Sequence, residues 1–149
     1  MRAIVQRVKN ASVSVDGNIV GKIDKGLVVL LGVEDEDTAD DALYMAEKIA
    51  GLRIFHDDEG KMNLSVQETG GEILAISQFT LLGDVRKGKR PSFTKAARPE
   101  KANELYQKFI DIVRTQDINV EEGIFQAEML VSINNDGPVT IMLDSKKVF

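Results

Sequence analysis

Gly26-Leu27-Val28-Val29-Leu30-Leu31-Gly32-Val33 is a continuous apolar run in a chain of 149 residues. Lys25 precedes it and Glu34 follows it, so both of its ends are marked by charge. An uninterrupted apolar run of this length is typical of a strand buried on both faces, because a half-exposed strand would alternate with polar residues. The sequence therefore predicts a fully buried strand at residues 26–33.

Further strands are predicted on both sides of this run. Residues 1–10 have the composition of a strand. Asp16-Gly17, flanked by alternating apolar residues, is typical of a tight hairpin turn within residues 13–20, since it tolerates positive φ. Gly70-Gly71 marks a boundary before the next apolar segment. The remaining expected strands are residues 52–55, 62–66, 72–81, 123–133 and 139–143.

Two helices are predicted. Thr38 can cap a helix that runs to about Ala50 and ends at Gly51. A second helix begins at Pro99, a favoured first-turn residue, and packs against the sheet. The expected apolar face of the first helix consists of Ala39, Ala42, Leu43, Ala46 and Ala50, and that of the second consists of Ala102, Leu105, Tyr106, Phe109, Ile112 and Val113.

The order of these elements indicates the fold class. Many strands with two helices, and no regular alternation of strand and helix, predict an α+β fold. We expect an antiparallel-rich or mixed sheet that closes toward a barrel, with the two helices packed against it. No repeat, linker or low-complexity segment divides the chain, so residues 1–149 are expected to form a single domain.

Composition argues against several classes of protein. Hydrophobic content of 43% and charged content of 29% are ordinary for a globular chain, and no apolar run approaches the ~20 residues that span a bilayer. Arg7 interrupts the apolar N-terminal stretch, so we expect no signal peptide, no membrane partner and a cytoplasmic location. There is no cysteine, which rules out disulfides and thiolate catalysis. The single histidine, His56, lies in an acidic turn and is interpreted as a solvated residue.

Charge is unevenly distributed along the chain. The net charge is −5, yet the segment from Asp84 to Lys101 carries seven basic and two acidic residues, a local charge of +5. Such a cluster is either a solvated loop or a surface that binds phosphate groups. The four cations near its start are Arg86, Lys87, Lys89 and Arg90.

Two short segments differ from the strands around them. Ser77-Gln78-Phe79-Thr80-Leu81 becomes polar at the end of an apolar strand. Its side chains and amides either serve a site or bond to nearby backbone. Asn135-Asp136-Gly137-Pro138-Val139-Thr140 interrupts an apolar run with Gly-Pro, a pair normally excluded from strand interiors. Either the chain turns sharply there, or its backbone is presented to another molecule.

The same segments carry a resemblance to a known family. The chain resembles the D-aminoacyl-tRNA deacylases, whose motifs Ser-Gln-Phe-Thr-Leu and Asn-Asp-Gly-Pro-Val-Thr are both intact here. The similarity continues through Gln6-Arg7-Val8, Arg90-Pro91-Ser92-Phe93 and residues 125–129, and covers essentially the whole chain. One position departs, because the family usually has a small residue where this chain has Gln126.

The resemblance implies an enzyme that hydrolyses the ester between a D-amino acid, or glycine, and the 3′-terminal adenosine of tRNA. It also implies a homodimer, in which a cis Gly137–Pro138 peptide enters the other subunit's pocket and excludes L-amino acids. The expected catalytic residues are Ser77, Gln78, Phe79 and Thr80. The expected supporting residues are Arg7, Met129, Asn135, Asp136, Val139 and Thr140. No cofactor and no metal are expected.

The expected mechanism leaves alternatives open. Substrate positioning, with backbone amides around Phe79 and Thr80 that stabilise the oxyanion, suffices for a reactive ester if the adenosine 2′-hydroxyl assists water. Thr80 as a nucleophile is the competing mechanism, but it lacks an evident base. Gln78 is expected to orient the adenosine or the ester. The basic segment is expected to contact acceptor-stem phosphates.

Two other functions remain in competition with the deacylase. One is a non-catalytic module that binds tRNA through residues 86–90 and releases no amino acid. The other is a small-molecule esterase, which is disfavoured because His56 is the only histidine available to pair with a serine.

Overall fold

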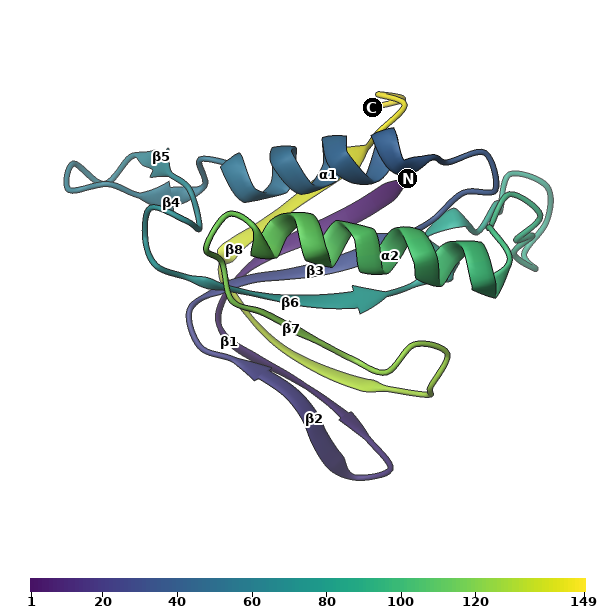
Figure 1. Ribbon diagram of the computed structural model, residues 1–149, viewed down its shortest axis with the longest axis horizontal. Helices are drawn as coiled ribbons and strands as arrows, with labels where there is room; N and C mark the ends of the chain where they lie inside the picture. Colours follow the sequence, from purple (N-terminus) through teal and green to yellow (C-terminus); the bar gives the residue numbers. More distant parts are fainter.

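The computed structural model describes residues 1–149, which form a six-stranded sheet, a separate two-stranded sheet (β4 and β5) and two helices (Figure 1). The helices are α1 (Ala39–Gly51) and α2 (Pro99–Arg114), with a short 3-10 helix, η1 (Phe79–Leu82). The strands are β1 (Arg2–Val15), β2 (Asn18–Ile23), β3 (Gly26–Gly32), β4 (Phe55–His56), β5 (Met62–Leu64), β6 (Glu72–Ser77), β7 (Val120–Glu122) and β8 (Leu130–Asp144).

β1 organises the sheet because it pairs with three neighbours. Its first half lies antiparallel between β3 and β8, and its second half lies antiparallel between β2 and β8. β3 and β6 run parallel, as do β6 and β7. The sheet is therefore mixed, and the predicted α+β class is confirmed.

β3 is buried on both faces, as its apolar run predicts. Leu27, Val29 and Leu31 belong to the larger core, which also contains the buried side chains of α1 and α2. Val28 belongs to a second, smaller core formed by side chains from β1, β2, β3 and β6. Successive residues of one strand thus serve two separate cores, because side chains alternate across a strand.

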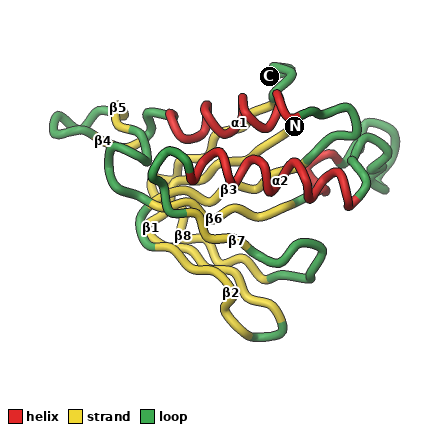
Figure 2. Tube along the Cα trace, in the orientation of Figure 1, coloured by secondary structure: helices red, strands yellow, loops and turns green.

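The sheet curls until its ends nearly meet (Figures 1 and 2). β2 and β7 stand at opposite ends of the strand order β2-β1-β3-β6-β7. Even so, a Cβ atom at Gly21 in β2 would lie 2.8 Å from the carbonyl oxygen of Glu122 in β7. Only glycine permits this approach, and the expected closure toward a barrel is confirmed.

Both helices cover the same face of the sheet, side by side (Figure 1). α1 begins with a capping box, in which the side chains of Thr38 and Asp41 each accept a hydrogen bond from the other's backbone amide. α2 begins at Pro99, as predicted. Neither helix combines the length and hydropathy that a membrane span requires.

The predicted apolar faces of the helices were partly wrong. In α1, Ala39 and Leu43 are exposed, whereas Met45 and Ile49 are fully buried. The buried face of α1 is therefore rotated about the helix axis relative to the predicted alanine-rich face. The reason is that α1 packs against both the sheet and α2. In α2, Ile110 is buried and Ile112 only partly so.

Three strand predictions also need correction. The segment 72–81 leaves the sheet at Ser77, because residues 79–82 form η1. Residues 123–129 form a loop rather than the start of a strand. The two expected C-terminal strands are a single strand, β8, because it pairs with β1 on both sides of the Gly-Pro interruption.

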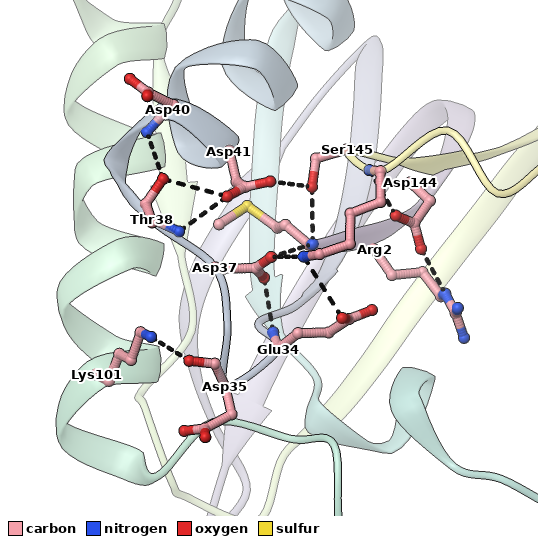
Figure 3. A network of polar contacts seen from close by, with 12 residues as sticks. Arg2, Glu34, Asp35, Asp37, Thr38, Asp40, Asp41, Lys101, Asp144 and Ser145 are labelled. Carbon is pink, nitrogen blue, oxygen red and sulfur yellow. Dashed lines mark hydrogen bonds and ion pairs between the residues drawn. The ribbon is translucent and has the colours of Figure 1, made fainter.

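A polar network joins both ends of the chain to the segment between β3 and α1 (Figure 3). The buried amino group of Met1 donates to Asp37 Oδ1 over 2.7 Å. Lys146 Nζ lies 2.7 Å from the same oxygen. Burial disfavours the charge of Lys146, but its hydrogen bond to Asp37 and the nearby carboxylates raise its pKa to about 12. Arg2 extends the network by donating from Nη1 to the carbonyl oxygen of Leu81, in η1, over 3.1 Å.

Candidate active site

A cleft of about 560 Å³ opens beside η1. Its walls come from the end of β3, the β6–η1 segment, the start of α2 with the loop before it, and the loop between β7 and β8. None of its lining side chains is an acid, a base or a thiol. The lining residues are Val33, Ser77, Gln78, Phe79, Thr80, Phe93, Ala96, Ala97, Pro99, Ala102, Phe125, Gln126, Ala127 and Met129.

The four residues predicted to be catalytic all line this cleft. Ser77 is the last residue of β6, and the Gln78 amide continues the sheet pairing by donating to the Leu31 carbonyl over 2.8 Å. The chain then turns into η1, so Phe79 and Thr80 contribute the first amides of a helical turn. Such amides have no carbonyl partner within the turn. Gln78 Nε2 donates to Thr80 Oγ1 over 3.1 Å, which links two of the predicted residues.

Aromatic side chains border the same cleft. The Phe79 ring is 55% exposed and meets Phe93 edge to face, with ring centroids 5.1 Å apart. Phe125 and Met129 line the cleft from the β7–β8 loop. Tyr106 stands 6.2 Å from Phe125, and its hydroxyl donates to the carbonyl of Ala75, two residues before Ser77. The packing of α2 therefore supports both the loop and the β6 end.

The Gly-Pro segment is a local excursion from the sheet. Asn135 pairs with Val8 and Thr140 pairs with Gln6, so residues 136–139 all stand opposite the single residue Arg7. The Gly137–Pro138 peptide bond is cis, and both residues are exposed. Gly137 has φ of +116°, a conformation that residues with a side chain rarely adopt.

The other residues of this motif hold the excursion in place. Asn135 Nδ2 donates to the carbonyls of Arg7 over 2.9 Å and of Val139 over 3.0 Å, closing the base of the excursion. Arg7 is buried, donates from Nη1 to the Ile54 carbonyl over 2.7 Å, and has Nε 3.3 Å from Asp136 Oδ2. Val139, the last residue of the excursion, is buried.

Thr140 completes the base of the excursion. Its hydroxyl donates to Asn135 Oδ1 over 3.4 Å and accepts from Gln6 Nε2 over 3.3 Å. Neither Gly137 nor Pro138 lines the cleft of its own chain. The structure thus brings Ser77–Thr80 and Met129 together, and separately groups Arg7 with residues 135–140.

The basic segment is an exposed loop closed at its base. Asp84 and Ser92 exchange two backbone hydrogen bonds of 2.8 and 2.9 Å. The Asp84 carboxylate also accepts hydrogen bonds from Nε and Nη2 of Arg86, at 2.9 and 2.6 Å. These bonds hold the pKa of Asp84 well below its usual range and raise that of Arg86. Arg86 is therefore charge-compensated, whereas Lys87, Lys89 and Arg90 form no ion pair within the chain.

Three features of the site escaped the sequence prediction. Phe93 stood in a recognised motif without an assigned role, and its contact with Phe79 depends on the closed loop. Gln126 differs from the small residue that is usual in the family, and it lines the cleft. The spacing of Asp84 and Arg86 could have indicated their pairing.

The family model described as D-Tyr-tRNA(Tyr) deacylase matches residues 4–144 of the chain. The chain is 63% identical to the D-aminoacyl-tRNA deacylase of Fervidobacterium nodosum and 62% identical to that of Koribacter versatilis, each over all 149 residues and the whole relative.

Two solved structures share the fold. One, named c-Myc DNA unwinding element binding protein, has a TM-score of 0.91 and 43% identity, with 97% of this chain and 98% of that chain covered. The other, described as a probable eukaryotic D-amino acid tRNA deacylase, has a TM-score of 0.82 and covers 95% and 97%. At 19% identity, that likeness concerns the fold alone.

Proposed function

Because this chain belongs to the D-aminoacyl-tRNA deacylase family and is a hydrolase, we propose that its cleft hydrolyses the ester that joins a D-amino acid to the 3′-terminal adenosine of tRNA. Glycyl-tRNA is a further substrate, since glycine has no side chain to reject. The observation that carries the proposal is the placement of Ser77, Gln78, Phe79 and Thr80 along one cleft.

The amides of Phe79 and Thr80 act as oxyanion donors. Their place at the start of η1 supports this role, because they have no partner within the turn. The lining side chains include no general base. We therefore assign activation of the attacking water to the 2′-hydroxyl of the substrate adenosine, with Gln78 and Thr80 holding the ester beside the amides.

A tRNA that ends in 2′-deoxyadenosine tests this mechanism. It removes the assisting hydroxyl but leaves the ester and every protein contact, so turnover of its D-tyrosyl ester is expected to fall by roughly 100-fold or more. Thr80→Val is the matched protein variant, and it is expected to retain substantial single-turnover activity on the natural substrate. Normal turnover on the deoxy substrate, or complete loss of chemistry in a folded Thr80→Val protein, would instead favour Thr80 as the nucleophile.

Gly137 and Pro138 form the gate that rejects L-amino acids. They are exposed, they project from the sheet, and a set of hydrogen bonds fixes their base. Since they do not line their own chain's cleft, we propose that they enter the cleft of a second copy in a homodimer. A wall of backbone cannot rotate away as a side chain can, so an L-side chain would collide with it.

Lys87, Lys89 and Arg90 bind phosphates of the acceptor stem. Their exposure and lack of internal partners support this assignment, and the interaction is expected to be largely independent of sequence. Arg86 has a lesser part because Asp84 already compensates it. Because such a substrate is used where proteins are synthesised, we also propose a cytoplasmic location.

A second candidate function is nucleic-acid binding without catalysis. The exposed cations favour it, as does the name of the solved relative, which refers to binding of a DNA element. A deacylation assay separates the two, because a binding module retains aminoacyl-tRNA without releasing the amino acid.

A further inference from the structure

One polar side chain of the cleft lies outside the segment that carries the mechanism proposed above. Gln126 lies on the loop between β7 and β8, and it is the only polar side chain that this loop contributes to the cleft. The other polar lining residues, Ser77, Gln78 and Thr80, all come from the β6–η1 segment.

The backbone gives no reason for a glutamine at this position. The Ala127 amide donates to the Ile124 carbonyl over 3.1 Å, which makes Gln126 the third residue of a four-residue turn. Its φ is +65°. A turn with positive φ at its third position favours glycine or asparagine, because other side chains are crowded there. Gln126 thus occupies a position whose backbone conformation disfavours a glutamine.

The amide of Gln126 is also free to bind a ligand. Of the two glutamines that line the cleft, Gln78 donates to Thr80 Oγ1, whereas the side chain of Gln126 is exposed and bonds to no other residue of the chain. A free carboxamide presents an NH2 donor group and a carbonyl acceptor side by side. That arrangement matches a ligand edge that presents an acceptor beside a donor.

The surroundings of Gln126 narrow the choice of ligand. Phe79, Phe93 and Phe125 line the same cleft, and Phe79 is more than half exposed. Aromatic faces combined with a polar group at the edge are how proteins hold unpaired bases. Adenine presents N7 as an acceptor beside the N6 amino group, and glutamine is a favoured bidentate partner for that edge.

We propose that Gln126 recognises the adenine base at the 3′ end of the substrate, with Nε2 donating to N7 and Oε1 accepting from N6. This inference rests on the proposed function, which brings a 3′-terminal adenosine into the cleft. It makes Gln126 a specificity-determining residue that orients the nucleotide. Oxyanion stabilisation stays with the amides of η1, and activation of the water stays with the 2′-hydroxyl.

Binding of a short oligonucleotide tests the inference without hydrolysis. The trinucleotide CCA is compared, by NMR titration, with a trinucleotide whose last base is purine, which lacks the N6 amino group. The unchanged protein is expected to bind CCA roughly 5- to 100-fold more tightly. Gln126→Gly suits the positive φ and removes the amide, so it should keep or raise the melting temperature and bind both trinucleotides equally. Glu128→Ala, an exposed change on the same loop outside the cleft lining, should keep the preference.

Two outcomes would overturn the inference. One is equal binding of both trinucleotides by the unchanged protein, and the other is a preference that survives in Gln126→Gly. In deacylation assays, Gln126→Gly should raise KM for D-tyrosyl-tRNA with little change in kcat. A variant that instead alters the preference between D-tyrosine and D-alanine would place Gln126 beside the amino acid. Failure of the unchanged protein to deacylate would count against the proposed function, while the trinucleotide result would still decide the role of Gln126.

Discussion

At the scale of single residues, the carboxamide of Asn135 explains why the Gly-Pro excursion has a defined shape. Its Nδ2 joins the carbonyls of Arg7 and Val139, and its Oδ1 accepts from Thr140. One side chain therefore bonds to both strands at the base of the excursion. An ion pair also joins Asp136, within the excursion, to the buried guanidinium group of Arg7.

Asn135→Asp is expected to remove the hydrogen bonds that fix the excursion and to make its conformation less well defined. The change keeps the shape but replaces the donor with an oxygen that faces two carbonyls, which should cost about 2 kcal/mol and lower the melting temperature by roughly 4–8 °C. Discrimination between D- and L-tyrosyl-tRNA should weaken as well. Asn134→Asp is the control, because Asn134 is exposed and bonds only to the side chain of Asn10. Equal melting temperatures for the two variants would contradict this account.

At the scale of elements, η1 is set by contacts that lie far away in the sequence. Polar and apolar residues alternate from Gln78 to Leu81 after the apolar β6, so the segment has the composition of a longer strand. The close approach of Gly32 in β3 and the hydrogen bond from Arg2 to the Leu81 carbonyl accompany the turn out of the sheet. Neither contact is visible in the local sequence, and this is why the strand prediction failed there.

Gly32→Ala tests the fit between β3 and η1. A Cβ at this position would lie 3.0 Å from the Gln78 carbonyl and 3.2 Å from Leu81 Cβ, so η1 must shift by a few tenths of an ångström. Because the η1 amides are proposed to stabilise the oxyanion, kcat is expected to fall by roughly 10- to 100-fold. Gly51→Ala, at the end of α1 with open space around it, should leave kcat unchanged. Unaltered kcat in a folded Gly32→Ala protein would show that the position of η1 is not critical.

At the scale of the whole molecule, local patterns predicted most of the fold. The apolar run of β3, the Thr38 cap and Pro99 each determine an element largely through nearby residues. The parallel pairing of β6 with both β3 and β7, and the near contact of β2 with β7, depend on how the sheet curls. The residues of the site could be named only through the two motifs, because their grouping depends on elements that are distant in sequence.

The charge of the basic loop should appear in the salt dependence of tRNA binding. Replacing Lys87, Lys89 and Arg90 together with alanine is expected to reduce the slope of log Kd against log salt concentration by about 2–3. Arg86→Ala is expected to change the slope much less, because Asp84 already neutralises that guanidinium. Fluorescence binding titrations at several salt concentrations measure both. If Arg86→Ala alone reduced the slope as much as the triple replacement does, Arg86 would have to break its ion pair with Asp84 in order to bind phosphate.

The most direct test of the central claim is the rate at which the purified protein releases amino acid from D-tyrosyl-tRNA and from L-tyrosyl-tRNA. The backbone gate predicts rapid hydrolysis of the D-ester and negligible hydrolysis of the L-ester under the same conditions. Gly137→Ala should disturb this selectivity, since a Cβ there would lie 2.9 Å from Val139 Cγ2 at a φ that suits only glycine. Equal rates on the two enantiomers by the unchanged protein would contradict the account.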